Sequence, residues 1–101
     1  MLFKDRYPKQ YEYFRAAVAD DVDSRREDNV VALRRVLAQL ETVHVFTKCA
    51  CGERGCETFS FVDTSQVVHR DRIAVRSRGR VTLFVDVDAH RNLLGIEKTP
   101  D

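Results

Sequence analysis

Three cysteines in the middle of the chain are the residues best suited to chemistry. Cys49, Cys51 and Cys56 lie together within residues 42–62, a stretch that also contains two glycines. Thiolates bind zinc well, and structural zinc sites usually take four Cys or His ligands in tetrahedral geometry. Three thiols therefore need a fourth ligand from elsewhere in the fold, and His69 could supply it. The sequence thus indicates a candidate zinc site formed by Cys49, Cys51, Cys56 and His69.

A β-hairpin is expected to gather these three sulfurs at its tip. Residues rich in β-branched and aromatic types flank a polar, glycine-containing loop at residues 52–55. Because side chains alternate between the faces of a strand, the cysteines share one face and Phe46, Phe59 and Phe61 share the other, which should face the core. The predicted pairs are Cys51 with Cys56, Cys49 with Thr58, Lys48 with Phe59 and Phe46 with Phe61.

Metal binding competes with two other interpretations of the cysteines. Small, half-buried thiols can simply fill a tight hairpin tip, and the Cys-x-x-Cys spacing of many zinc sites is absent, so this interpretation is preferred. In a redox role, Cys51 and Cys56 would be cross-strand neighbours, and the charges of Lys48 and Arg54 would favour a thiolate. A bound zinc would take its fourth ligand from His69, His90 or a water.

Five arginines at even positions could form a basic stripe on one strand. They are Arg70, Arg72, Arg76, Arg78 and Arg80. Such a stripe could contact phosphates, but the expected turn at residues 77–80 interrupts it and no aromatic platform accompanies it. An acidic run at residues 20–28 offers an internal counter-charge. The arginines are therefore expected to lie on a solvent-exposed sheet face or to protect a sheet edge from pairing with another chain. Only weak, salt-labile association with nucleic acid is expected.

No set of residues in the sequence is assembled for catalysis. Asp86, Asp88 and Asn92 follow the spacing of a calcium-binding loop, but Arg91 stands where that loop needs glycine. A tight hairpin stabilised by Asp and Asn side chains explains the same residues. The sequence contains neither a phosphate-cradling glycine loop nor a His-Glu-x-x-His pattern. We therefore expect no enzyme activity and assign no catalytic or cofactor-binding residue.

Composition favours one small cytoplasmic domain. A chain of 101 residues can build one modest core, so a single α+β domain is expected over residues 1–101. Charged residues make up 33% of the chain, but the net charge of +1 favours neither nucleic acid nor an anionic membrane. The sequence lacks a transmembrane run and a signal-peptide core. Three cysteines cannot all pair within one chain, which fits a reducing compartment.

Two amphipathic helices are expected in the first half of the chain. Apolar residues recur at steps of three or four between residues 7 and 22, and Pro8 suits a first turn, so a helix is predicted over residues 8–21. Ser24 and Glu27 match a capping box, which predicts that a second helix begins at Ser24. The predicted buried stripes are Tyr11, Phe14 and Val18 in the first helix, and Leu33, Leu37 and Leu40 in the second.

The hydrophobic period changes to two from residue 42 onward, which predicts strands. Beyond the cysteine hairpin, strands are expected at residues 67–76, 81–87 and 93–97, separated by turns. Short connections favour an antiparallel meander. The predicted fold is therefore α+β, with two N-terminal helices packed on one face of a roughly five-stranded antiparallel meander sheet that presents Phe46, Phe61, Leu83 and Val85 to them.

Two segments resemble hairpins found in small uncharacterised bacterial proteins of the actinobacterial type. The first is the Cys-x-Cys-Gly…Cys-x-Thr-Phe pattern at residues 49–59, and the second is the Asp-rich turn before Gly-Ile-Glu at residues 85–97. The resemblance implies both hairpins and a bacterial cytosolic setting. It implies no activity.

The leading prediction is a non-catalytic binding or interaction module with a protein partner. The chain has enough patterned apolar residues to form a hydrophobic core, but it contains no set of residues arranged for catalysis. The alternative is a small metal-binding or thiol-regulatory protein that uses the hairpin of Cys49, Cys51 and Cys56. Zinc is the only cofactor considered, and only under this alternative. The metal content of protein purified without chelator separates the two functions.

Overall fold

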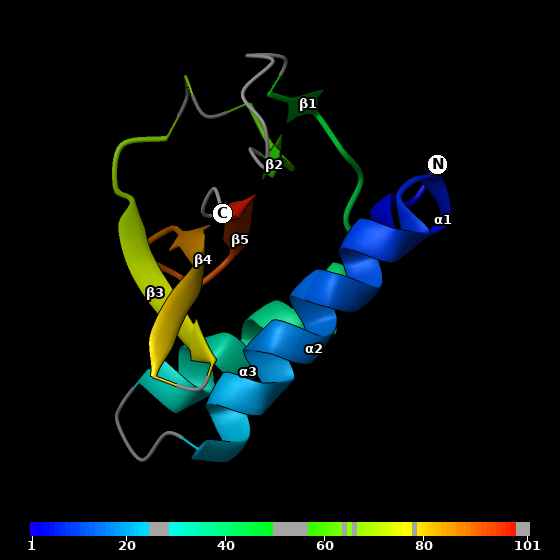
Figure 1. The fold of residues 1–101 in the computed structure, drawn as a ribbon. Helices are drawn as coiled ribbons and strands as arrows, with labels where there is room; N and C mark the ends of the chain where they lie inside the picture. Colours follow the sequence, from blue (N-terminus) through cyan, green and yellow to red (C-terminus); the bar gives the residue numbers. More distant parts are fainter. Residues whose placement is uncertain (25–28, 50–56, 64, 66, 78, 99–101) are drawn as a thin grey trace.

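Helices and a five-stranded antiparallel sheet form two layers (Figure 1), so the α+β class is confirmed. The computed structural model describes residues 1–24, 29–49, 57–63, 65, 67–77 and 79–98. The helices within these residues are α1 (Phe3–Arg6), α2 (Pro8–Ser24) and α3 (Asn29–Leu40). The strands are β1 (Thr47–Lys48), β2 (Glu57–Ser60), β3 (Asp71–Ser77), β4 (Arg80–Val87) and β5 (Leu93–Lys98).

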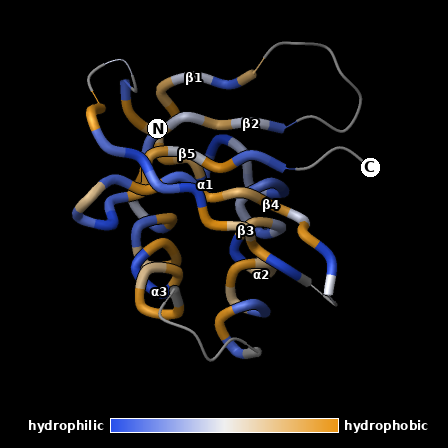
Figure 2. Tube along the Cα trace, turned by 90° about the vertical axis from the view of Figure 1, so that its left-hand side faces the viewer, coloured by the Kyte–Doolittle hydropathy of each residue, from blue (hydrophilic) through white to orange (hydrophobic). Residues whose placement is uncertain are grey.

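The strand order differs from the predicted meander. The order is β1-β2-β5-β4-β3, which Figure 2 shows from the upper edge of the sheet downward. β5 lies between β2 and β4, and all four of its first residues are buried. An uninterrupted apolar run such as Leu93–Leu94–Gly95–Ile96 is consistent with a fully buried strand. The last strand of the chain therefore takes the central position, and β3 becomes an edge strand.

Gly95 allows β5 to approach β2 closely. Gly95 is paired with Ser60, and a Cβ atom at Gly95 would lie 2.8 Å from the backbone oxygen of Phe59. No Cβ atom tolerates that distance from a carbonyl oxygen, so any side chain here would force the two strands apart. The glycine that the resemblance places before Ile96 thus has a packing role in the middle of the sheet.

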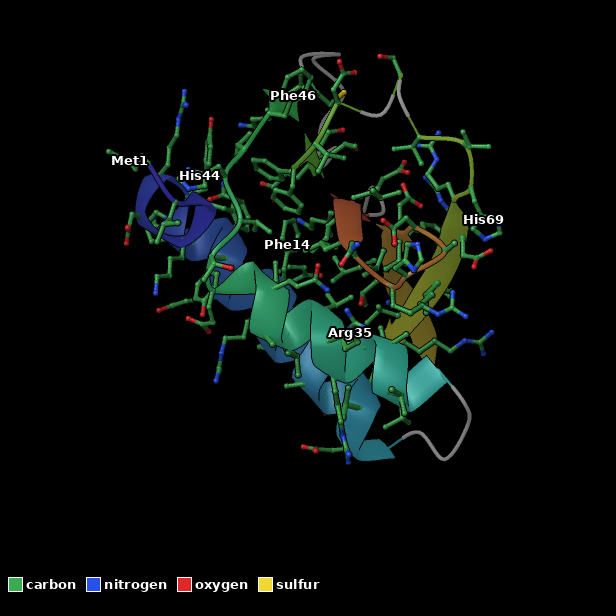
Figure 3. All side chains as sticks on the ribbon, turned by 180° about the vertical axis from the view of Figure 1, so that it is seen from behind. Met1, Phe14, Arg35, His44, Phe46 and His69 are labelled. Atoms are coloured by element: carbon green, nitrogen blue, oxygen red, sulfur yellow. The ribbon has the colours of Figure 1, made fainter. Side chains whose placement is uncertain are left out.

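α2 and α3 pack on each other and on one face of the sheet, as predicted. Phe14, Val18, Leu33 and Leu40 are fully buried, and Figure 3 shows Phe14 between the helices and the sheet. On β4 the buried residues Leu83, Val85 and Val87 alternate with Thr82, Phe84 and Asp86, which confirms the predicted period of two. Tyr11 and Leu37 are only partly buried at the margin of this core, where Val36 is fully buried.

α2 is longer than predicted, and the capping-box prediction for Ser24 is wrong. Ser24 is the last residue of α2, and α3 begins at Asn29, while Glu27 lies outside the described residues. A buried carboxylate helps to hold the last turns of α2 in place. Asp21 Oδ2 accepts a hydrogen bond of 3.2 Å from the backbone N–H of Arg76 on β3. Because the side chain of Asp21 is the acceptor for this N–H, the hydrogen bond joins α2 to the edge of the sheet.

The predicted pairs of Lys48 with Phe59 and of Cys49 with Thr58 are confirmed, but the predicted pair of Phe46 with Phe61 and the predicted orientation of Phe46 are wrong. Lys48 pairs with Phe59, and the backbone N–H of Cys49 donates to the oxygen of Thr58 at 2.8 Å, whereas the predicted pair of Cys51 and Cys56 lies outside the described residues. Phe46 is 57% exposed.

A β-bulge explains the exposure of Phe46. The N–H of Phe46 donates to the oxygen of Ser60 at 2.8 Å, although Ser60 is already paired with Thr47. Two residues facing one on the neighbouring strand form a β-bulge, which shifts the alternation of side chains by one position. Val45 consequently packs against the core in place of Phe46.

Phe3 fills the centre of the aromatic core, a role that its charged flanks did not reveal in the sequence. Phe3 is fully buried, and its ring centroid lies 5.0–6.4 Å from those of five other rings. These rings belong to Tyr7, Tyr11, Phe14, Phe59 and Phe61. The backbone N–H of Phe3 also donates to the oxygen of Val43 at 2.8 Å, which fixes α1 beside the segment that leads into β1.

The side chain of Gln39 connects α3 to the turn between β4 and β5. Its Nε2 donates to the oxygen of Arg91 at 3.0 Å, and its Oε1 accepts from the N–H of Leu93 at 2.7 Å. Asp88 closes the same turn by accepting bonds from His90 and Asn92, which confirms the predicted Asp-stabilised hairpin. Arg91 adopts a positive φ of 64° there. This backbone conformation is unfavourable for residues other than glycine, so the hydrogen bonds of the turn must maintain it.

We predict that Leu33→Ala lowers the free energy of unfolding by about 2–5 kcal/mol, because it removes a fully buried side chain and leaves a cavity. Urea denaturation of the purified variants measures this change. Val31→Ala on the same helix is the matched control, since Val31 is 67% exposed and its truncation should change stability by about 0.5 kcal/mol or less. Equal effects of the two substitutions would contradict the packing of α3 described above.

Candidate functional site

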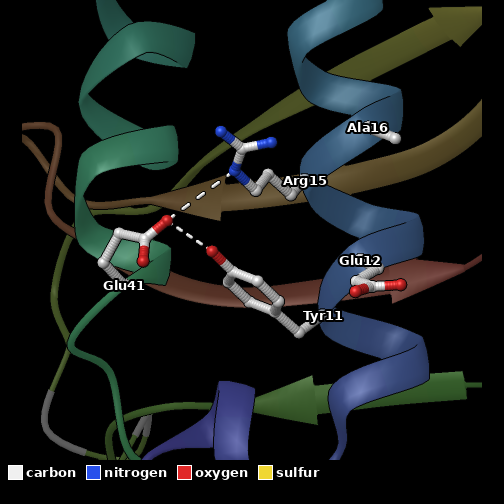
Figure 4. A pocket seen from close by; sticks show the side chains of 5 residues that line it. All are labelled: Tyr11, Glu12, Arg15, Ala16 and Glu41. Atoms are coloured by element: carbon white, nitrogen blue, oxygen red, sulfur yellow. Dashed lines mark hydrogen bonds and ion pairs between the residues drawn. The ribbon is translucent and has the colours of Figure 1, made fainter.

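An open pocket lies between α2 and the residue that follows α3 (Figure 4). It is lined by Tyr11, Glu12, Arg15, Ala16 and Glu41 and has a volume of about 530 Å³. This volume falls within the range of small-molecule sites, although such sites usually enclose their ligand more completely. We refer to it as the Glu41 pocket.

The carboxylate of Glu41 organises the pocket. Oε1 accepts a short hydrogen bond from the hydroxyl of Tyr11 and lies 3.7 Å from Nε of Arg15. Oε2 lies 3.4 Å from Nζ of Lys4 on α1. Tyr11 and Arg15 are one helical turn apart, so both side chains leave α2 on the same face and converge on Glu41.

These contacts shift two pKa values in opposite directions. The hydrogen bond to Glu41 raises the pKa of Tyr11 above its ordinary value, and partial burial and the negative charge of Glu41 add to the effect. The hydrogen bond from Tyr11 lowers the pKa of Glu41, as do the hydrogen bond and charge of Lys4. Near neutral pH the site therefore holds a neutral phenol beside an ionised carboxylate.

Sequence reasoning did not identify this pocket. Tyr11 was expected only as part of the buried stripe of the first helix, and Glu41 lies 30 residues away from it. The one local signal was the four-residue spacing of Tyr11 and Arg15, which predicts neighbouring side chains but not their common partner. The contact with Glu41 depends on how α2 and α3 pack.

The predicted zinc ligands are only partly described, and those that are described lie apart. Cys49 is half-buried beside β1, while Cys51 and Cys56 lie outside the described residues. His69 precedes β3 at the opposite edge of the sheet, and Figure 3 shows it far from Phe46 and β1. Four strand spacings separate these edges, or about 19 Å, so the structure does not bring Cys49 and His69 together.

His69 and His90 have other surroundings. Nε2 of His69 lies 3.1 Å from Oδ2 of Asp71, which also accepts a hydrogen bond of 2.7 Å from Arg91. The hydrogen bonds from His69 and Arg91 lower the pKa of Asp71. His90 is exposed in the turn closed by Asp88. In the parts of the chain that the structure describes, no group of three or more His, Cys, Asp or Glu residues is arranged to hold a metal ion.

The arginine stripe divides into paired and solvent-facing members. Arg72 lies over the ring of Phe84 at 5.1 Å and forms ion pairs of 3.0 Å with Asp86 and with Glu97. Arg70, Arg76 and Arg80 are exposed, and Arg78 lies outside the described residues. Only weak association with nucleic acid stays our prediction for these residues.

Comparisons with protein-family models, curated proteins and solved structures found no match. Within the described ranges, no helix combines the length and the apolar character needed to cross a membrane. The fold and the pocket therefore define a two-layer α+β protein whose function must be argued from its own surfaces.

We predict that Tyr11→Phe weakens the acid dependence of stability. A lowered pKa means that Glu41 contributes stability above its unfolded pKa of about 4.3 and loses this contribution as the pH falls through the folded pKa. Without the Tyr11 hydroxyl the pKa of Glu41 rises toward its ordinary value, so the difference in unfolding free energy between wild type and variant should shrink from about pH 7 to about pH 3.

Urea denaturation across this pH range measures the difference, and Tyr13→Phe is the matched control. Tyr13 lies on the same helix with an exposed side chain, so its hydroxyl should not affect the acid dependence. A Tyr11→Phe variant whose pH profile runs parallel to that of the wild type would show that the hydrogen bond does not shift Glu41.

We also predict that the protein folds without metal and contains three reduced thiols. Among the described residues, the buried core formed by the helices and the sheet contains no cysteine, so EDTA should leave the far-ultraviolet circular dichroism unchanged. Metal analysis of protein purified without chelator is the accompanying measurement. Stoichiometric zinc that disappears together with thermal stability in the Cys49→Ser and Cys51→Ser variants would favour the metal-binding function instead.

Proposed function

We propose that this protein is a non-catalytic module that binds a protein partner through the uncovered face of its sheet. The observation that carries the proposal is the layer arrangement, because among the described elements the helices contact the sheet on one face only. The opposite face, which we call the open face, includes Thr58, Ser60, Phe84, Asp86 and Glu97. A sheet face that no helix covers offers a broad, preformed surface for a partner.

The shape of the open face favours close approach by a partner. Thr58 and Ser60 on β2 and Gly95 on β5 give this face a group of small residues, which lies beside Phe84, Asp86 and Glu97. At the β1 end the bulge turns Phe46 outward, and Val62 nearby is 37% exposed. Exposed aromatic residues beside small ones are typical anchors of protein interfaces.

The charges of the open face favour a partner with a basic residue. Arg72 is paired with both Asp86 and Glu97, so these three residues together carry one net negative charge, while Arg80 lies at the far end of β4 on the same face. A segment that combines apolar side chains for Phe46 with one Lys or Arg would complement both features. An amphipathic helix laid across the face suits this pattern better than an added strand, because β1 is only two residues long and β3 carries charged residues at the other edge.

Site-specific photo-cross-linking in native cells tests the proposal. A benzoylphenylalanine at position 46 should form a discrete covalent adduct with a partner, because Phe46 lies at the proposed interface. Position 31 on α3 is the matched control, since Val31 and Phe46 are both exposed hydrophobic residues on different layers. The adduct at position 46 should also disappear when Asp86→Lys and Glu97→Lys reverse the charges of the open face.

Three results would contradict the proposed surface. Adducts of equal yield at positions 31 and 46 would indicate nonspecific contact. Absence of any adduct at position 46 would show that no partner occupies the open face. An adduct that survives both charge reversals would show that the acidic residues do not recognise the partner.

Metal binding or thiol regulation is the alternative function. It is supported by the backbone hydrogen bond from Cys49 to Thr58, which is the pair expected in the cysteine hairpin. Metal content decides between the two functions, as described above. For either function we infer a cytoplasmic location in a bacterium, from the odd number of cysteines and the resemblance of the two hairpins.

A further inference from the structure

We propose that the partner inserts an arginine side chain into the site that Arg72 fills in the free protein, so that Arg72 competes with the partner for the open face. This inference rests on the proposed function, because it concerns the same face, and it adds the chemical identity of one contact and its regulation. The site consists of Phe84, Asp86 and Glu97, and we call it the guanidinium site. A guanidinium of this chain is already bound there.

The contacts of Arg72 show that the site matches the geometry of a guanidinium. Nε of Arg72 lies 3.0 Å from Oδ1 of Asp86, and Nη2 lies 3.0 Å from Oε2 of Glu97. Nη2 also donates to Oδ2 of Asp86 at 3.5 Å, so this carboxylate accepts from two nitrogens. Cζ of Arg72 lies 5.1 Å from the centre of the Phe84 ring. A flat cation with several N–H donors meets both carboxylates and the ring, whereas a compact ammonium reaches fewer of them.

The two acceptors are held more firmly than the guanidinium between them. Asp86 belongs to β4 and Glu97 to β5, and each of these strands has a neighbour on both sides in the sheet. The side chain of Asp86 is only 14% exposed. Arg72 belongs to the edge strand β3, and its side chain is 51% exposed and crosses β4 to reach β5. The acceptors therefore form a fixed site, and the long side chain of Arg72 is the part that can leave it.

The surroundings of the guanidinium site favour the approach of a second cation. Gly95 pairs with Asp86 on one side and with Ser60 on the other, and it adds no side chain to the open face between them. A side chain of the partner can therefore reach Asp86 across β5. With Arg72 in place, the three charged residues still carry one net negative charge, which attracts a cation.

The exchange of Arg72 for an arginine of the partner is close to balanced. The incoming guanidinium makes the contacts that Arg72 gives up, so the exchange alone neither favours nor opposes binding. Ion pairs at exposed positions are weak because water screens them, which keeps the cost of opening small. Contacts of the partner elsewhere on the open face, such as those with Phe46, then decide the outcome. Because only molecules with a vacant site can bind, Arg72 raises the apparent dissociation constant of the partner.

Nuclear magnetic resonance of the ¹⁵N-labelled full chain tests the site without the partner. The probe is N-acetylargininamide, which carries a guanidinium and no other charge. It should cause saturable shifts of the amide signals of residues 84, 86 and 97 in the Arg72→Gln variant, because this substitution vacates the site. In the wild type, where Arg72 fills the site, binding should be about tenfold weaker or worse. Arg76→Gln is the matched control, since it removes the same charge from the same strand but leaves the site filled.

Two further comparisons identify the contacts. N-acetyllysinamide carries the same charge on an ammonium and should bind the Arg72→Gln variant about threefold more weakly or worse than the arginine compound. Adding Phe84→Leu to Arg72→Gln should weaken binding of the arginine compound by about threefold or more, because leucine is apolar but offers no ring face.

Four results of these titrations would overturn the guanidinium site and leave the proposed function intact. They are equal affinities of Arg72→Gln and wild type for the arginine compound, an equal gain in Arg76→Gln, equal binding of the lysine compound, and no effect of Phe84→Leu.

Photo-cross-linking from position 46 in native cells tests the competition itself. Arg72→Gln should raise the yield of the adduct with the partner by about threefold or more over the wild type, whereas Arg76→Gln should leave it unchanged. An unchanged or lower yield in Arg72→Gln would overturn this inference, while the adduct would still support the proposed function. Absence of the adduct in the wild type and in both variants would contradict the proposed function and this inference with it.

Discussion

The burial of Phe3 is the contact on which the rest of the arrangement depends. Its ring lies against aromatic rings from both α2 and β2, and burying such a side chain contributes about 1.5–3 kcal/mol. Phe3 also fixes α1 through the bond from its N–H to Val43. Because α1 is held there, Lys4 reaches Glu41, and the ring of Tyr7 lies within 5.2 Å of the ammonium of Lys48 on β1. One buried ring thus sets the positions of the pocket and of the edge strand.

The central position of β5 determines which surfaces remain available. Gly95 lets β5 lie close to β2, and the amide of Gln39 holds the start of β5 against α3. Gly95 adds no side chain to the open face, while the other face of β5 contributes Ile96 to the core. The same glycine therefore allows close packing of the strands and leaves space on the open face beside Phe84.

Local patterns predicted much of the fold, and long-range contacts account for what they missed. The alternation along β4 and the register of Lys48 with Phe59 follow from periods and turn length, which are local properties. The exposure of Phe46 depends on a second hydrogen bond to Ser60, and no period contains that information. Strand order was missed because the period of a strand defines its faces but not its neighbours. The pocket was missed because Tyr11 and Glu41 meet only through helix packing.

The pocket and the open face should act independently. They lie on different layers, and the side chains between them, including Phe14 and Val85, are fully buried in one close-packed core. Coupling between two sites requires an element with two arrangements, of which each ligand favours a different one. Substitutions at Glu12 and at Phe46 should therefore have additive effects on the free energy of unfolding, as expected for distant positions without common partners. A deviation from additivity would point to α1, because it is the element that contacts Glu41 through Lys4 and the segment before β1 through Phe3.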